Sequence, residues 1–331
     1  MNQTADAALL IVAYKSRATM ERLREAVNGL SVKPAEILVL ENGSPDGERV
    51  SEADLPDGAQ LIVSEDNLGF AAGNNRLAGR AAAQWLVLLN PDAFPEPDWL
   101  AELMAASARH PQATLFGSTQ RAADMPGVLD GAGDVYHGFG VPYRGGYGLA
   151  IEPPVEGETF APCGAAMMVR RDAFEALGGF DEDYFCYVED VDFGYRARLA
   201  GHSVIQASSA IVDHMGYASS ARRSEFATYH GARNRLWTFL KNTPGWLLWA
   251  SLPAHIAITG ALWLSAARHR QFTLFGKALG DALAGWGPLM DKRRRVQHGR
   301  TVSAWSMARS MAWNPLRLLS RAPHIRRVEA S

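Results

Sequence analysis

The stretch LVLLNPDAF, residues 86–94, describes a strand that ends abruptly at a carboxylate. Four apolar residues, typical of a buried strand, are followed directly by Asn90, Pro91 and Asp92. One interpretation is an ordinary turn, because Asn-Pro-Asp is a common turn sequence. The other is a ligand site, because ligands in open α/β folds bind beyond the carboxyl ends of parallel strands, where Asp92 would lie.

Similar apolar runs recur along the chain, and helix-like segments lie between them. The runs are residues 7–14, 36–44, 59–65, 84–92, 113–118 and 164–171, and the helix-like segments include 18–29, 70–83, 171–180 and 189–202. Strands that alternate with helices form βαβ units, and continuously apolar strands are buried on both faces. The sequence therefore predicts an α/β fold with a mostly parallel sheet. A Gly-, Pro- and Asp-rich stretch over 121–160 predicts a long loop.

The composition predicts a globular protein. The chain has 331 residues, 47% of them apolar, which is enough for one large domain or two smaller ones. Its two cysteines, Cys163 and Cys186, form neither a disulfide framework nor a zinc site, as is usual in a reducing compartment. The N-terminus lacks a basic region and a long apolar run, so we expect no signal peptide and a cytoplasmic location.

The net charge of −2 hides a strong asymmetry. Residues 1–214 carry 15 Lys and Arg against 31 Asp and Glu, a net charge of −16. Residues 215–331 carry 18 Lys and Arg against 4 Asp and Glu, a net charge of +14. A basic, Trp-bearing tail predicts an anionic partner, either nucleic acid or an anionic membrane surface.

Residues 246–267 form the most apolar segment, about as long as a transmembrane helix. Pro253 and His255 in its middle argue against a simple span. We expect an interfacial or re-entrant pair of helices, with Trp residues at the headgroup level and Arg268, Arg270 and the KRRR run at 292–295 on lipid phosphates. The alternative is a buried helical subdomain packed on the sheet.

A second group of carboxylates lies in GGFDEDYFCYVEDVDFGYRARLAGH, residues 178–202. Its acidic residues are interleaved with aromatic residues, which is unusual for a solvated acidic face. Glu189 and Asp190 stand at the expected start of a helix, where the macrodipole stabilises negative charge. A helix cap is the structural alternative for either residue.

A histidine, His214, ends another apolar strand in IVDHMGYASS, residues 211–220. A lone histidine there is ordinary, but imidazole together with carboxylate oxygen is a workable ligand set for a divalent cation. Strand or helix ends bearing Asp92, the Glu189-Asp190 pair and His214 together predict one site.

Seven motifs in this order resemble the inverting family-2 glycosyltransferases, most closely the bacterial rhamnosyltransferase and galactofuranosyltransferase branch. They are VAYKS (12–16), VLENGSPDG (39–47), NLGFAAGNN (67–75), LLNPDA (88–93), GAAMMVRR (164–171), GGFDEDYFCYVEDVD (178–192) and DHMGYASS (213–220). The resemblance covers roughly residues 7–240. It implies a GT-A glycosyltransferase domain over 1–240, followed by a helical, basic, membrane-associating region over 241–331.

The resemblance also implies a nucleotide-sugar donor, carried on dTDP or UDP, and a divalent cation, Mg²⁺ or Mn²⁺. Asp92 and His214 match the metal ligands. The residues that match donor-binding positions are Tyr14, Glu41, Asn42, Asn67, Gly69, Asn75, Asn90 and Arg233. Glycines in such loops let the backbone approach a phosphate closely.

By the same resemblance Asp190 is the base that takes the proton from the acceptor hydroxyl. Glu189 orients Asp190 or binds a sugar hydroxyl. The two residues could also exchange these roles. The metal neutralises the leaving diphosphate. The hydroxyl then displaces the diphosphate in one step, which inverts the anomeric centre. Two residues depart from the family pattern: Ala13 stands where the family usually has Thr, and Glu41 where it usually has Asp. These departures leave the choice of nucleotide open.

The segment YHGARNRLWTFLKN, residues 229–242, resembles a less specific part of the family, in which Arg233, Asn234 and Arg235 close over a diphosphate. Surface solvation is the alternative for these residues. The basic tail fits a glycan acceptor carried on a polyprenyl diphosphate, with the enzyme peripheral on the cytoplasmic face of the inner membrane.

Two other classes of function remain as alternatives. A sugar nucleotidyltransferase would carry a Gly- and basic-rich signature near its N-terminus, which does not follow LLIVAYKSR. A protein that only binds anionic lipid or nucleic acid would use the basic tail alone. Because readers of nucleic acid carry a basic face on the fold itself, and the sheet-bearing half here is acidic, we expect no nucleic-acid partner.

Overall fold

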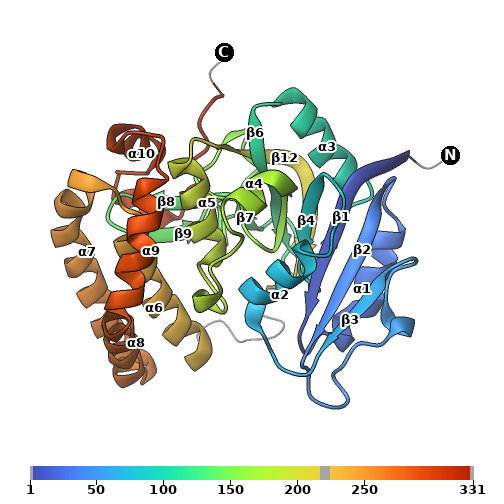
Figure 1. The fold of residues 1–331 in the computed structure, drawn as a ribbon, viewed down its shortest axis with the longest axis horizontal. Coiled ribbons are helices and arrows are strands. Elements are labelled where there is room, and N and C mark those ends of the chain that lie inside the picture. Colours follow the sequence, from blue (N-terminus) through green and yellow to red (C-terminus); the bar gives the residue numbers. More distant parts are fainter. Residues whose placement is uncertain (1–2, 217–223, 329–331) are drawn as a thin grey trace.

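A computed structural model of the chain describes residues 3–216 and 224–328. Within these residues a ten-stranded sheet has the strand order β10-β12-β6-β11-β4-β1-β2-β3, with β5 paired to β12 and β7 paired to β6 (Figure 1). Its strands are β1 (Gln3–Ala13), β2 (Val32–Asn42), β3 (Gln60–Ser64), β4 (Trp85–Leu89), β5 (Ala93–Pro95), β6 (Ala113–Ala122), β7 (Leu129–Ala132), β10 (Gly157–Glu158), β11 (Ala166–Arg170) and β12 (Ser203–His214).

Helices cover both faces of the sheet, as the continuously apolar strands predict. Alternate residues of β1 point to opposite faces: Leu9 and Ile11 belong to one buried core, and Ala8 and Leu10 to the other. The first core is closed by α1 (Arg17–Asn28) and α3 (Trp99–Arg109), and the second by α2 (Gly69–Ala78), α4 (Arg171–Ala176) and α5 (Glu189–Leu199). The predicted α/β architecture is confirmed.

The direction of the strands places the strand ends of interest at one edge of the sheet. β3, β2, β1 and β4 are mutually parallel, β11 runs antiparallel between β4 and β6, and β12 is parallel to β6. Leu89 at the end of β4 pairs with Ala166 at the start of β11. The carboxyl ends of β1, β2, β4, β6 and β12 therefore lie at the same edge as the start of β11.

The loop predicted over 121–160 is wrong in part, because this stretch contains short strands. β7 pairs with β6, β10 pairs with β12, and β8 (Asp134–His137) pairs with β9 (Val141–Arg144) in a separate two-stranded sheet. Strands of two to four residues are too short to show an alternating pattern in the sequence.

The C-terminal region begins with helices that stand together at the end of the molecule away from β3 (Figure 1). The helices are α6 (Glu225–Asn242), α7 (Gly245–Ala266), α8 (Phe272–Ala284), α9 (Trp286–His298), α10 (Ala304–Ser310) and α11 (Leu316–Ser320). A short 3-10 turn at Ala267–His269 follows α7, and two others lie earlier in the chain, at Glu52–Asp54 and Glu182–Tyr184. After α11 the chain returns to the sheet, where Arg326 bridges to Glu158.

The boundary predicted at residue 240 falls inside α6, and the division into two domains stays a prediction. Lys241, immediately after it, is 1% exposed and lies 2.6 Å from Asp181 and 2.8 Å from Asp192. Met307 and Met311 pack with Tyr195 of α5 in a shared buried cluster. The C-terminal region is thus packed closely against the sheet-bearing part.

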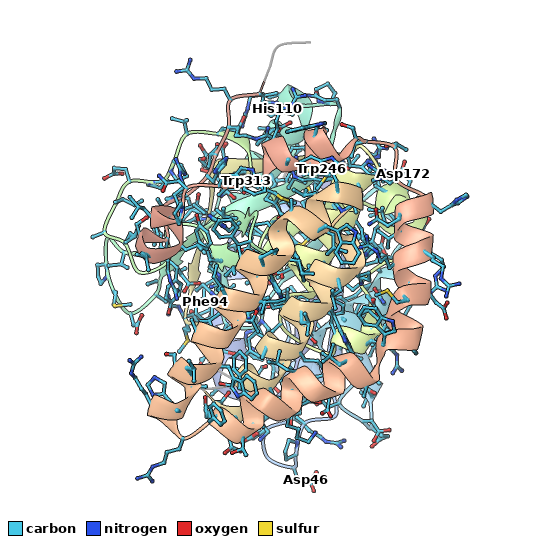
Figure 2. All side chains as sticks on the ribbon, turned by 90° about the vertical axis from the view of Figure 1, so that its left-hand side faces the viewer. Asp46, Phe94, His110, Asp172, Trp246 and Trp313 are labelled. Carbon is cyan, nitrogen blue, oxygen red and sulfur yellow. The ribbon has the colours of Figure 1, made fainter. Side chains whose placement is uncertain are left out.

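The apolar segment is one continuous helix, α7, so the expected pair of helices is wrong. Among the described residues one helix, Gly245–His269, is long and apolar enough to cross a membrane, with a mean hydropathy of 1.5 and 28% of its apolar window buried. Trp249 is 71% and Leu264 69% exposed. Figure 2 views this side of the molecule, with Trp246 and Trp313 labelled. The alternative of a fully buried subdomain therefore does not hold for α7.

Two members of the KRRR run do not reach toward a lipid surface. Lys292 forms ion pairs with Asp181 and Asp183. Arg293 donates to the backbone oxygens of Leu240 and Thr243 at 2.5 and 2.8 Å. Lys292 therefore fastens α9 to the turn before α5. Arg293 fastens α9 to the end of α6, where its guanidinium satisfies carbonyls that the helix leaves unpaired.

Candidate active site

The loops after β1 and β2 are held together by hydrogen bonds to side chains of the second loop and of Glu41. Ser44 accepts a hydrogen bond from the backbone N–H of Lys15, the residue after Tyr14. The buried carboxylate of Glu41 accepts from the N–H groups of Ser44 and Val50, at 2.7 and 2.8 Å. Its carboxylate therefore closes the loop that follows β2, and contact between Glu41 and a donor stays a prediction.

Asn42 and Asn67 form the next part of this edge. The Asn42 side chain donates to Asn67 Oδ1 at 3.0 Å and accepts from the N–H of Leu68 at 3.0 Å. Asn67 Oδ1 also accepts from the N–H of Gly69. The two amides therefore shape the loop that leads into α2, and their contact with a donor stays a prediction.

Gly69 and Asn75 have structural tasks that the sequence did not reveal. Gly69 has a φ of 79°, and a Cβ there would lie 2.5 Å from the backbone oxygen of Phe185, which accepts from the N–H of Phe70. The close approach at this glycine is thus to the protein's own backbone. The Asn75 amide donates to Phe180 O and Glu182 Oε1, so both of its N–H groups are occupied by the loop before α5.

The Asn90-Pro91-Asp92 stretch is a turn at the sheet edge where β4 ends. The N–H of Ala93 donates to Asn90 O at 3.1 Å, which closes the turn, and Asn90 N–H donates to Ala165 O at 2.8 Å. The turn directs the Asp92 carboxylate toward His214, the last residue of β12. The turn is therefore confirmed, and the ligand site at Asp92 stays a prediction.

Asp92, His214 and Asp130 form a buried cluster at the sheet edge. His214 Nε2 lies 3.3 Å from Asp92 Oδ1, and His214 Nδ1 is hydrogen-bonded to Asp130 Oδ2 at 2.7 Å. Arg144 of β9 donates to the same carboxylate of Asp130. Burial alone would lower the pKa of His214, but the carboxylates of Asp130 and Asp92 outweigh it and raise the pKa.

The donor set of this cluster fits a divalent cation. His214 Nε2 is buried and has no hydrogen-bond partner among the described residues, although a carboxylate oxygen faces it. Adjacent ligands of an octahedral Mg²⁺ or Mn²⁺ ion are about 3 Å apart, close to the separation seen here. A carboxylate on the second ring nitrogen, as Asp130 provides, is the usual support for a histidine that binds metal.

Glu189 and Asp190 open α5, after a backbone segment with unusual conformation. Phe185, Tyr187 and Val188 have φ values of 62°, 70° and 72°, which non-glycine residues adopt only when the surroundings hold them. Val188 occupies the helix-cap position, so neither carboxylate is the N-cap. Asp190 accepts instead from the N–H groups of Gly164 and Val191, both at 2.8 Å.

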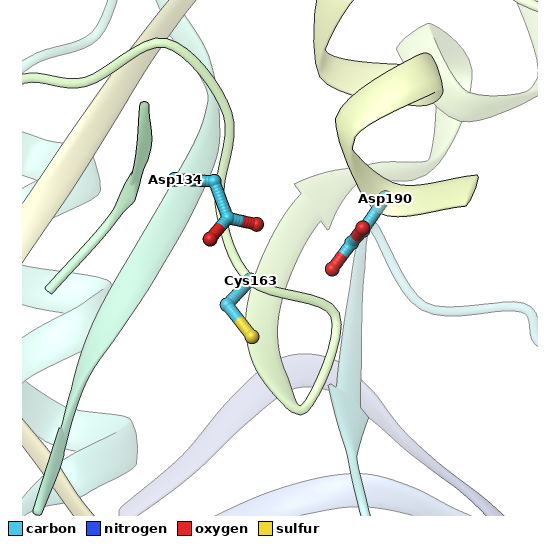
Figure 3. A group of neighbouring side chains, drawn as sticks. All are labelled: Asp134, Cys163 and Asp190. Atoms are coloured by element: carbon cyan, nitrogen blue, oxygen red, sulfur yellow. The ribbon is translucent and has the colours of Figure 1, made fainter. Parts of the chain in front are cut away.

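Asp190 lies beside Asp134 of β8 and the thiol of Cys163, and Figure 3 shows the two carboxylates pointing into the space between them. The ligand atoms of the three residues lie within 4.8 Å of one another. Burial raises the pKa of Asp190, and it raises the pKa of Asp134 well above its ordinary value. Burial also raises the pKa of Cys163 to about 12, so this thiol is a poor nucleophile at neutral pH.

The segment 183–188 is fixed from α6. Arg233 donates to the backbone oxygens of Asp183 and Tyr184, and its guanidinium lies 4.4 Å from the centre of the Trp237 ring. The buried Asn234 donates to the oxygens of Tyr184, Cys186 and Tyr187. These two side chains therefore position the strained segment before Asp190. Contact between Arg233 and a donor stays a prediction.

Three residues of the site were missed by the sequence analysis: Asp130, Asp134 and Arg144. All three lie in 121–160, in strands of four residues. The spacing of Asp130 and Asp134 around three small residues was the available signal. Gly131 belongs to the same arrangement, because a Cβ there would lie 2.4 Å from Arg144 Cδ.

The sequence of the chain is similar to those of known glycosyltransferases. The model of the family described as Glycosyl transferase family 2 matches residues 8–178. The N-acetylglucosaminyl-diphospho-decaprenol L-rhamnosyltransferase of Mycobacterium tuberculosis is 30% identical over 247 residues, which cover 67% of this chain and 80% of that protein.

Solved structures of glycosyltransferases share the fold. Staphylococcus aureus TarS 1–349 in complex with UDP-GlcNAc aligns with a TM-score of 0.54 and 15% identity, over 92% of each chain. The mannosyltransferase PcManGT from Pyrobaculum calidifontis, in complex with GDP-Man and Mn²⁺, aligns with a TM-score of 0.51 and 18% identity, over 94% of this chain and 88% of that chain.

The family match runs from β1 to the end of α4 and includes the Asp92 turn. The sheet order, the helices on both faces and the helical C-terminal region agree with a GT-A fold. The chain is a glycosyltransferase and belongs to glycosyl transferase family 2.

Proposed function

We propose that this enzyme moves a sugar, rhamnose or a galactofuranose-like sugar, from dTDP or UDP to a saccharide acceptor on a polyprenyl diphosphate, with inversion. The observation that carries the proposal is that candidate metal ligands and a candidate base lie at the same edge of the sheet. Asp92 and His214 offer metal ligands 3.3 Å apart, and Asp190 is a buried carboxylate with a raised pKa. Two neighbouring residues connect the metal ligands to the base. The N–H of Gly164 donates to Asp190, and the backbone oxygen of Ala165 accepts from the N–H of Asn90.

Asp190 acts as the base in this proposal. Two backbone N–H groups hold its carboxylate, which orients the oxygen that takes the acceptor proton. A carboxylate with a raised pKa accepts a proton more readily than an ordinary aspartate. Glu189 is buried with a pKa raised well above its ordinary value, and its Oε2 has no partner among the described residues. A protonated Glu189 suits hydrogen bonding to a sugar hydroxyl and not the role of base.

Asp92 and His214 would hold the divalent cation, with Asp130 fixing the tautomer of His214. When bound there, the cation supplies the positive charge that stabilises a departing nucleoside diphosphate. The solved mannosyltransferase structure contains Mn²⁺ together with its nucleotide sugar, which supports the choice of a divalent cation.

The acceptor and the location follow from the relatives and the C-terminal helices. The mycobacterial relative is described as acting on N-acetylglucosaminyl-diphospho-decaprenol. A lipid-linked acceptor lies at a membrane, and α7 exposes apolar side chains such as Trp249, Ile256 and Leu264. We therefore place the enzyme on the cytoplasmic face of a bacterial inner membrane, in contact with it through α7.

A transfer assay tests the proposed function. Purified enzyme would be incubated with Mn²⁺, a GlcNAc-diphosphoprenol acceptor and either dTDP-L-rhamnose or a UDP-sugar, and the product identified by mass spectrometry and its anomeric configuration by NMR. We expect one donor to be consumed only with metal and the new linkage to be inverted. Retained configuration, or no transfer from either type of donor, would contradict the proposal.

Asp130→Asn is expected to weaken Mn²⁺ binding by about 10–100-fold, because loss of a carboxylate behind a metal-bound histidine has effects of this size. The measurement is calorimetric titration of Mn²⁺ into the purified variants. Asp46→Asn is a matched control, since the Asp46 side chain is fully exposed. Equal Mn²⁺ affinity in Asp130→Asn and wild type would remove Asp130 from this role.

A further inference from the structure

Asp134 of β8 is a buried residue whose carboxyl oxygens have no partner in the protein. It is 6% exposed. Its backbone is fixed on both sides, by hydrogen bonds with Ala161 and by pairing with Arg144 of β9. No hydrogen bond or ion pair reaches its carboxyl oxygens from residues 3–216 and 224–328. The fold therefore sets the place of this side chain and leaves its oxygens to another group.

Asp130, four residues earlier, has its partners within the same part of the protein. Its carboxylate is hydrogen-bonded to His214 Nδ1 at 2.7 Å and accepts from Arg144. Asp130 thus belongs to the cluster of Asp92 and His214. Asp134 faces the candidate base instead, so the two aspartates of this stretch serve different parts of the site.

The oxygens of Asp134 lie beside Asp190, as Figure 3 shows. A carboxyl oxygen of each residue and the sulfur of Cys163 lie within 4.8 Å of one another, and Asp190 is the least buried of the three. Next to Asp190, the buried Oε2 of Glu189 also lacks a hydrogen-bond partner in the described part of the chain. Buried polar atoms rarely stay unpaired, so two carboxyl groups in this state beside one base indicate that a polar ligand binds there.

This group suits hydroxyl ligands better than a cation. Mg²⁺ and Mn²⁺ prefer oxygen ligands, whereas the third member here is the thiol of Cys163, which stays protonated at neutral pH. Burial and the nearby Asp190 raise the pKa of Asp134 well above its ordinary value. Hydrogen bonds from Gly164 and Val191 favour the charged form of Asp190. A protonated carboxyl group beside an ionised one offers both a donor and acceptors to the hydroxyl groups of a sugar.

We propose that Asp134 binds a second hydroxyl group of the acceptor sugar, on the carbon next to the one whose hydroxyl Asp190 deprotonates. This rests on the proposed function for the role of Asp190. Sugars carry hydroxyl groups on neighbouring carbons, and two O–H···O bonds of about 2.7 Å from such groups reach carboxyl oxygens that lie within 4.8 Å of each other. The bond to Asp134 orients the sugar so that one hydroxyl reaches the base. Asp134 thereby determines which position of the acceptor receives the new sugar.

Acceptors that lack one hydroxyl group test this recognition. GlcNAc-diphosphoprenol would be compared in the transfer assay with analogues that each lack one of its sugar hydroxyls. With wild type we expect no product from the analogue without the attacking hydroxyl. We expect kcat/KM to be lower by about tenfold or more for an analogue without the neighbouring hydroxyl, because a buried polar group then loses its partner.

Asp134→Leu removes the carboxyl group and keeps a side chain of similar size. For the intact acceptor, kcat/KM should fall by about tenfold or more, and for the analogue without the neighbouring hydroxyl it should change by less than about threefold. Asp134→Asn, which still donates and accepts hydrogen bonds, should lose less than Asp134→Leu. Asp124→Leu is the control, because Asp124 lies in an exposed turn after β6, and its kcat/KM values should match those of wild type for every acceptor.

Two kinetic results would overturn the proposal. If Asp134→Leu lowers kcat/KM by the same factor for the intact acceptor and for every analogue, Asp134 does not recognise a hydroxyl group. If it raises the KM of the nucleotide sugar and leaves the KM of the acceptor unchanged, Asp134 contacts the donor sugar instead.

Thermal unfolding separates recognition from a structural role. Without acceptor, both Asp134 variants should unfold at the same temperature as wild type or higher, because a buried polar group without a partner destabilises the fold. A lower unfolding temperature in both variants would show that Asp134 serves the fold and would overturn the proposal. If Asp134→Leu does not fold, Asp134→Asn gives the same comparison of acceptors, and unchanged discrimination among them would overturn the proposal.

Calorimetric titration of the same acceptors separates this proposal from the proposed function. Transfer by wild type with no dependence on Asp134 for any hydroxyl would reject only the hydroxyl site. Tighter binding of the intact acceptor than of its analogue, lost in Asp134→Leu but without transfer from any donor, would reject only the function.

Discussion

Asp190→Asn is expected to lower kcat by about 10²–10⁴-fold, the range typical for removal of a general base. The asparagine keeps the shape of the side chain and can still accept from the N–H of Gly164, but it cannot take the acceptor proton. Mn²⁺ and nucleotide affinity should be unchanged, because the Asp92 cluster does not include Asp190. Steady-state kinetics on the variant, with calorimetry of the nucleotide, would give both quantities.

Glu189→Gln is the matched control for this experiment and decides which carboxylate is the base. Glutamine resembles the protonated form that a raised pKa gives Glu189, so kcat should fall by less than about tenfold. A loss in Glu189→Gln as large as in Asp190→Asn, or a larger one, would assign the role of base to Glu189 and contradict the account.

The pH dependence of wild type follows from the same residue. Burial raises the pKa of Asp190 above its ordinary value and outweighs the hydrogen bonds from Gly164 and Val191. A base must be ionised to act, so activity is full above this raised pKa and is lost as the pH falls through it. We expect the acid limb of kcat/KM at a higher pH than an ordinary aspartate, with a pKa of about 3.9, would give. A limb at or below that pH would contradict the assignment.

Lys241→Met is expected to destabilise the folded protein by about 3–5 kcal/mol, as is usual when one partner of a buried ion pair is removed. Lys241 lies between the carboxylates of Asp181 and Asp192, and Asp192 is fully buried. Without the ammonium group, the buried carboxylate of Asp192 and the half-buried carboxylate of Asp181 lose their common counter-charge. Urea unfolding, followed by fluorescence of the tryptophans, would measure the change in free energy of unfolding.

Lys277→Met is the control, because Lys277 pairs with Asp281 on the exposed surface of α8 and such pairs contribute little. Its unfolding midpoint should match that of wild type. The pH gives a second check. Burial would raise the pKa of Asp192, but Lys241 and Arg196 outweigh it and lower the pKa. The stabilisation from Asp192 is therefore present above the ordinary pKa of an aspartate and is lost as the pH falls below it. Equal midpoints for Lys241→Met and Lys277→Met would contradict this role.

The sequence predicted those features that depend on long apolar runs and on the ends of long strands. Continuous runs such as residues 84–92 gave the strands of the parallel sheet, because burial on both faces leaves a strong compositional signal. Asp92 and His214 follow such strands, and the structure places them 3.3 Å apart. Asp190 opens a helix next to the same sheet edge, and its hydrogen bond to Gly164 depends on pairing between distant strands.

Other features were not predictable, for two physical reasons. Asp130, Asp134 and Arg144 belong to strands of four residues, which are too short to show an alternating pattern in the sequence. Side-chain length also mattered for Glu41, whose carboxylate reaches backbone N–H groups of its own loop. Sequence spacing alone does not distinguish such a bond from one to a ligand.

The basic tail illustrates a limit of charge counting. Its excess of Lys and Arg was interpreted as a surface for anionic lipids, yet Lys241 and Arg235 are buried and Lys292 forms ion pairs with acidic residues of the sheet-bearing part. The acidic excess of one half and the basic excess of the other thus partly neutralise each other at the interface between them. Net charge by segment shows that two parts attract but does not show which residues become buried.

The claim that Asp92 and His214 hold a cation for a nucleoside diphosphate is tested most directly by nucleotide binding. UDP and dTDP would each be titrated into wild type and Asp92→Asn by calorimetry, with and without Mn²⁺. The account predicts that one nucleotide binds wild type only with Mn²⁺, and that Asp92→Asn loses this binding. Equal binding with and without metal, or binding that Asp92→Asn retains in full, would contradict it and leave Asp92 as a turn residue only.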